Sequence, residues 1–172
     1  GGKLDIRGMT TVLDGVIASN NRAGYVGGHV AISGSEASVV RAVSALGSNY
    51  GFDDIDTIIG RYRNSAQILD STLSDRGLRE LEIGTLAITK SATLVEGACL
   101  KAPSITLAAK NAILLERESS VLASGPSGQA VFTVPDGLFA MAPNALVGAS
   151  KMIELNAASA LLNGKMNSDG GT

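Results

Sequence analysis

The chain has 172 residues, enough for one domain with a substantial core, and 45% of them are apolar although only 3% are aromatic. A formal net charge of −2 argues against a dedicated nucleic-acid-binding protein, and the single cysteine excludes an internal disulfide framework and a cysteine-based zinc site. No stretch approaches the roughly 20 consecutive apolar residues that a membrane-spanning helix needs, so we expect no membrane span and no nucleic-acid partner.

The N-terminal part of the chain has the pattern of short strands joined by turns. Residues 4–6 and 30–32 carry apolar side chains at every second position, which is typical of a strand with one buried face. A glycine-rich loop, residues 19–28, separates the two runs. The runs are too short for helices, and Gly, Ser and Asn at the joints allow sharp bends.

Residues 45–77 break this pattern. Their apolar residues have the i, i+3, i+4, i+7 spacing of one helix face: Ile55, Ile58, Ile59 and Tyr62. An aspartate ahead of them, at position 53 or 54, is placed to cap the helix N-terminus. The range therefore predicts an irregular or partly helical insertion, after which strand character returns near residues 67–70.

A phrase of about twenty residues recurs in the second half of the chain. Residues 104–107, 112–116 and 120–124 repeat residues 85–88, 92–96 and 99–102, at offsets of 19, 20 and 21 residues. A unit this short cannot close a core alone and must stack on its neighbours, each coil adding about 4.8 Å along an axis. The repeat therefore predicts an all-β parallel β-helix (β-solenoid) with coils of about 20 residues, running as a single segment over residues 1–172.

An antiparallel β-sandwich is the alternative fold, because it also consists of short, evenly spaced strands. The pairs Asp14-Gly15 and Asn163-Gly164 would suit hairpin turns between such strands. A sandwich, however, gives no reason for a whole phrase to recur, so the solenoid is favoured.

The sequence offers little catalytic chemistry. The acidic residues Asp53, Asp54 and Asp56 do not converge at that spacing, and they suit a helix N-terminus in a solvated loop. His29 stands at a strand start without the elbow motif of a serine nucleophile, so we expect a surface or edge-strand residue; Cys99 has no histidine beside it in the repeat. We therefore expect a protein that is not an enzyme, with no catalytic residue, no metal and no cofactor.

Several phrases together carry a resemblance to a known family. They are residues 4–15, the Gly-Gly-x-Val-x-Ile-Ser phrase within 27–34, residues 68–84, and the Ala-Pro-x-Ile-x-Leu phrase at 102–107. Taken together, these phrases resemble the filamentous haemagglutinin-like family, large secreted β-helical exoproteins of bacteria that are exported by two-partner secretion. The resemblance implies a secreted or cell-surface location. Because that family's secretion domain is not evident and the chain opens without Met, we expect an interior segment of a longer protein.

The favoured function is a structural and adhesive rod, whose insertion carries the contact surface because irregular segments carry specificity. The contact residues predicted there are Tyr50, Phe52, Asp53, Asp54, Asp56, Arg61, Tyr62 and Arg63. The alternative is a self-assembling filament subunit, either bactofilin-like or an extracellular fibre, because a solenoid without caps offers open strand edges. The expected partners are neighbouring coils of the same chain or of other copies, and a host or cell-surface glycan or protein.

Overall fold

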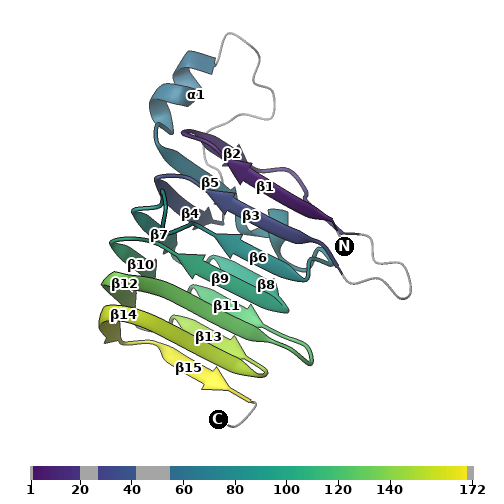
Figure 1. Ribbon diagram of the computed structural model, residues 1–172, viewed down its shortest axis with the longest axis vertical. Coiled ribbons are helices and arrows are strands. Elements are labelled where there is room, and N and C mark those ends of the chain that lie inside the picture. Colours follow the sequence, from purple (N-terminus) through teal and green to yellow (C-terminus); the bar gives the residue numbers. More distant parts are fainter. Residues whose placement is uncertain (1, 20–26, 42–54, 170–172) are drawn as a thin grey trace.

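The computed structural model describes residues 2–19, 27–41 and 55–169, and these form a β-solenoid of about five turns with very little helix. The predicted parallel β-helix is confirmed, and every strand pairing recorded among these residues is parallel. Figure 1 shows the strands stacked along the long axis of the molecule, with helix α1 (Ile55–Arg61) standing off one end. No described helix is both long enough and apolar enough to cross a membrane.

The coils have three faces. The first face holds β1 (Lys3–Arg7), β3 (His29–Ser33), β6 (Glu80–Ile83), β9 (Ser104–Ala108) and the first parts of β12 (Gln129–Met141) and β14 (Met152–Leu162). The second holds β2 (Thr11–Leu13), β5 (Ser65–Leu69), β4 (Glu36–Val40), β7 (Ser91–Leu94), β10 (Ala112–Leu115) and the ends of β12 and β14. The third holds β8 (Cys99–Ala102), β11 (Ser120–Ala123), β13 (Leu146–Ala149) and β15 (Lys165–Ser168).

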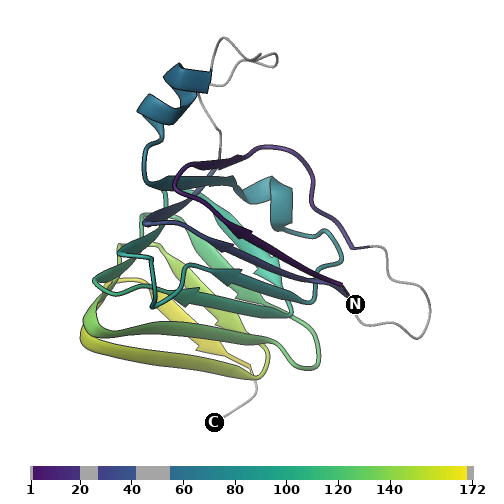
Figure 2. The same ribbon diagram turned by 45° about the horizontal axis from the view of Figure 1, so that its top comes forward.

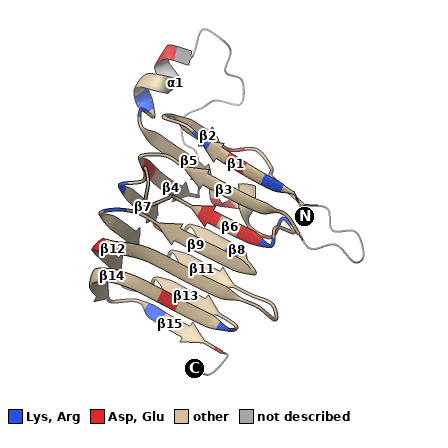
Figure 3. Cartoon of the chain, in the orientation of Figure 1, with Lys and Arg blue, Asp and Glu red and all other residues tan. Residues whose placement is uncertain are grey.

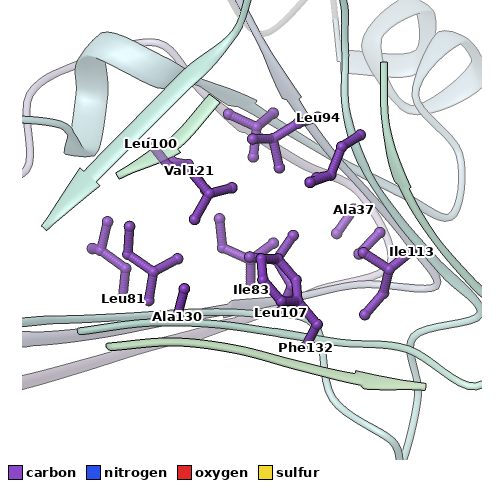
Figure 4. Packing of buried hydrophobic residues seen from close by; sticks show 14 of the residues in the cluster. Ala37, Leu81, Ile83, Leu94, Leu100, Leu107, Ile113, Val121, Ala130 and Phe132 are labelled. Carbon is purple, nitrogen blue, oxygen red and sulfur yellow. The ribbon is translucent and has the colours of Figure 1, made fainter. Parts of the chain in front are cut away.

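Stacking in register places like side chains on one another inside the solenoid. On the first face, Ile83, Leu107, Phe132 and Leu155 follow each other from coil to coil. The first three are buried, and the rings of Phe132 and Phe139 lie 4.9 Å apart. Figure 4 shows aliphatic side chains from all three faces meeting on the axis. Because each strand alternates, the residues between them point outward.

The predicted phasing of the repeat is correct at one strand and wrong at another. Cys99 pairs with Ser120, which is the predicted offset of 21 residues. Ser104 pairs with Glu80, at an offset of 24 residues, and not with residue 85. Residues 85–88 form a turn instead, reached through Gly84, whose φ of +80° favours glycine and whose added Cβ would collide with the carbonyl oxygen of Ala108. The alternation at 86–88 imitates a strand, but Leu86 and Ile88 are exposed.

Residues of the predicted insertion return to the solenoid out of chain order. After β4 the chain makes an excursion that includes α1 and comes back as β5, which lies between β2 and β4 on the second face. Strand β5 is therefore paired on both edges, with Ala66 and Ile68 fully buried. Figure 2 shows the excursion and α1 above this end of the stack. The range 45–77 thus contains a stacked strand as well as helix.

Helix α2 (Asp70–Leu73) and the residue after it close the edge of the third face. The Asp70 carboxylate accepts a hydrogen bond from the Cys99 N–H at 3.0 Å. The Ser74 hydroxyl donates to the Cys99 carbonyl at 2.7 Å and accepts from the Lys101 N–H at 3.1 Å. Two side chains thereby satisfy the outer edge of β8, where a further strand would otherwise pair.

A charge placed inside the stack should unfold it. Leu107 is completely buried, so the carboxylate of Leu107→Asp would have no partner, and we expect a loss of about 4 kcal/mol or more of the free energy of unfolding. Thr133→Asp is the matched control, because Thr133 is an outward residue on the next strand of the same face, and it should cost less than about 1 kcal/mol. Urea unfolding measures both values. Equal losses in the two variants would show that the inward register is wrong.

The edge closure at β8 gives a second prediction. Ser74→Ala leaves the Cys99 carbonyl and the Lys101 N–H without their partner, which should cost about 1–3 kcal/mol of the free energy of unfolding. Ser71→Ala, one helical turn earlier, removes a hydroxyl from an exposed side chain and should change stability by less than about 0.5 kcal/mol. Chemical denaturation of the pair checks this, and a neutral Ser74→Ala would mean that the edge does not depend on that hydroxyl.

Candidate functional site

The predicted contact surface is only partly within the described residues. Tyr50, Phe52, Asp53 and Asp54 lie outside them. The remaining four predicted residues lie in α1 or directly after it, at the end of the solenoid: Asp56, Arg61, Tyr62 and Arg63.

The described part of this surface is polar and stands free of the coils. Asp56, Arg61 and Arg63 are exposed, and the Arg61 guanidinium lies 5.8 Å from the centre of the Tyr62 ring. Neither arginine forms an ion pair with any residue that the structure describes. Ile59, on the predicted apolar face of the helix, is 44% exposed, so this face is not fully packed against the coils. Two unpaired cations beside an aromatic ring can stack on a sugar or hold an acidic group.

A second cluster lies on the outward side of the first face and was not predicted. His29 on β3 is the register partner of Glu80 on β6, and Glu82 lies two residues further along the same side of β6. The His29 Nδ1 is 3.9 Å from the nearer Glu80 oxygen, and the Nε2 is 3.2 Å from a Glu82 oxygen. Strand β3 pairs with β1 and β6, so the expected edge position of His29 is wrong.

The burial of these three side chains differs from that of ordinary surface charges. The His29 side chain is 21% exposed and each glutamate side chain is 39% exposed. The His29 Nε2 has no contact with solvent and makes no hydrogen bond that meets geometric criteria, despite the nearby carboxylate. Glu80-x-Glu82 alone was visible in the sequence as two carboxylates on one strand face. The histidine comes from 51 residues earlier, across the excursion, and only the register brings it in.

The neighbouring strand β1 carries its own ion pair. Arg7 donates two hydrogen bonds to Asp5, at 3.0 and 2.8 Å. The hydrogen bond from Arg7 is the main cause that lowers the pKa of Asp5 below its ordinary value, and it raises the pKa of Arg7. Arg7 is thus occupied by Asp5, and Lys3, the register partner of His29, is the other cation of this strand. Figure 3 shows these charges of β1 and β6 beside largely uncharged strands further along the face.

No family model, curated protein or solved structure matches this chain.

A groove at one corner of the solenoid is a third feature of the surface. It has a volume of about 620 Å³ and is lined by Arg76, Arg79 and Lys101, with Pro103 and Ser124 on its floor and rim. Lys101 is paired with Asp75, its ammonium nitrogen lying 3.2 Å from the carboxylate. The groove is open and cationic, and the residues that line it include no nucleophile beside a general base.

The two end coils form the fourth candidate surface. Leu155 and Leu162 on β14 continue the inward files of Phe132 and Met141, which are buried. Leu155 is only partly buried and Leu162 is 53% exposed, because no described strand pairs with the outer edge of β14. At the other end, Ile6 continues the file of Ile32 and is also only partly buried. Both ends therefore present unpaired strand edges together with apolar side chains.

Proposed function

We propose that this chain is a structural and adhesive rod segment of a secreted or cell-surface bacterial exoprotein of the filamentous haemagglutinin-like kind, without catalytic activity. The observation that carries the proposal is the stack itself: about five parallel coils in register, with end coils whose edges are open to further coils. Stacked coils joined by hydrogen bonds along the axis form a stiff body that can hold a contact surface away from a cell. The phrases at residues 27–34 and 102–107 support the family.

The adhesive contact is proposed to lie at α1 and the residues that follow it. Arg61, Tyr62 and Arg63 stand clear of the coils, as Figure 1 shows for the helix. An arginine beside an aromatic ring suits a glycan or a protein surface that carries acidic groups. The coils behind it would then serve as the support, with their own outward faces largely uncharged along β9, β11 and β13.

The location and size of the native polypeptide test this proposal. An antibody raised against the chain should detect, in the culture medium or on the surface of intact cells, a polypeptide well above 17.5 kDa. Mass spectrometry of the captured protein should place residues 1–172 inside a longer sequence. A product confined to the cell interior would overturn the proposal. Lysed cells serve as the control that the antibody reaches an interior antigen.

A self-assembling filament subunit is the second candidate, and the exposed end coil favours it. Leu162 lies in the inward file and Leu161, its neighbour, faces outward, yet their exposed fractions are similar, 53% and 57%. A second copy stacked on β14 would bury Leu162 and leave Leu161 at the surface. Edge strands with exposed apolar residues associate readily in this way.

This pair of leucines provides the matched variants for that candidate. If the chain polymerises end to end, Leu162→Lys should abolish assembly because it buries a charge between coils, whereas Leu161→Lys should leave assembly intact. Sedimentation velocity over a range of protein concentrations measures the outcome. A chain that stays monomeric at every concentration would overturn the filament candidate and leave the rod proposal standing.

A further inference from the structure

We propose that His29, Glu80 and Glu82 bind a divalent transition-metal ion such as Zn²⁺ on the outer side of the first face. The site is independent of the proposed rod function. It is built by two adjacent strands, β3 and β6, whose register sets His29 directly beside Glu80 and places Glu82 on the same side. One ligand atom from each residue lies within 4.8 Å of the others, a spacing that small side-chain rotations can close around one ion.

The distance between the histidine and Glu82 is already close to that of two ligands on one ion. The His29 Nε2 and the Glu82 oxygen are 3.2 Å apart. Two ligands bound to a tetrahedral Zn²⁺ at roughly 2.1 Å each lie about 3.4 Å from one another. Glu80 lies on the other side of the ring and has to turn toward the Nε2 to become the third ligand, with water completing the coordination.

The protein itself leaves the Nε2 without a partner. That nitrogen has no solvent contact, and no hydrogen bond of acceptable geometry reaches it from any described residue. A buried polar atom in this state costs free energy unless a ligand satisfies it. The two glutamates are of like charge on one strand face, and of the cations on β1, Arg7 is occupied by Asp5. A bound cation would relieve both the unpaired nitrogen and the carboxylate repulsion.

The donor set selects the class of ion. One imidazole nitrogen and two carboxylate oxygens suit Zn²⁺ and its neighbours in the first transition row, whereas Ca²⁺ takes six to eight oxygen ligands. The glutamates are partly exposed, so an ion can enter from solvent although the imidazole nitrogen is covered. No thiol takes part, since the lone cysteine, Cys99, lies on the third face.

Binding would tie together parts of the chain that are distant in sequence. His29 precedes the excursion and Glu80 follows it, so an ion between them links the coil before the excursion to the coil after it. A ligand that binds only the folded chain stabilises it by mass action. The expected effect is a rise in melting temperature on the order of 5 °C when free Zn²⁺ exceeds its dissociation constant about a hundredfold.

The test is isothermal titration of the full chain with ZnCl₂ in metal-free buffer, with thermal melting as the second readout. We expect one Zn²⁺ per chain. His29→Gln and Glu82→Gln should each weaken binding about tenfold or more and remove the rise in melting temperature. Glu154→Gln is the matched control, because Glu154 occupies the same outward position as Glu82, three coils away on the same face, and it should bind as the unaltered chain does.

Two further measurements keep the outcome decisive. Cys99→Ser should retain full affinity, and CaCl₂ in place of ZnCl₂ should give no comparable melting shift. Glu82→Gln changes a partly exposed side chain at nearly constant shape, so melting in metal-free buffer should show that it stays folded even if His29→Gln does not. Absence of Zn²⁺ binding by the unaltered chain, or equal affinity in Glu82→Gln and Glu154→Gln, would overturn the proposal.

Discussion

The structure depends on one constraint, the parallel hydrogen bonding that holds each coil in register with the next. Once a strand such as β9 is paired with β6 and β12, every inward residue must lie on the inward residue of the coil below. A charge or a cavity at one level is then felt by two neighbours rather than one. This explains why the inward files consist of Ala, Val, Ile and Leu with two phenylalanines at one level, and why so little aromatic residue is needed to build the core.

The same constraint makes the unpaired edges the exposed part of the molecule, and one end manages them. The chain sends β5 back between β2 and β4, so the last levels at that end are interlocked rather than simply stacked. Beside them, α2 supplies Asp70 and Ser74 to the edge of β8, where side-chain oxygens take the place of a strand's backbone groups. The first and second faces keep open edges at β1 and β2, so the closure is specific to the third face.

The sequence was sufficient for the fold class because stacking leaves a repeat in the chain, and alternation within it marks the buried face. It was not sufficient for the phasing at Glu80–Ile83, since Leu86 and Ile88 alternate just as well, and only the turn after Gly84 shows that they face solvent. It also could not give the place of β5. Strand order depends on which edge is free when the chain returns, and periodicity contains no information about that.

The candidate sites differ in the same way. The surface at Arg61–Arg63 could be found from the sequence, because a break in a repeat is local and visible. The cluster of His29 with Glu80 and Glu82 could not, because its members are neighbours only through the register of β3 and β6 across the excursion. In a solenoid, each outward position lies beside the same position of the next coil, so chemistry on a face is assembled across coils. An interruption between two coils shifts that assembly to residues far apart in sequence, which is where this fold can place a site without any local motif.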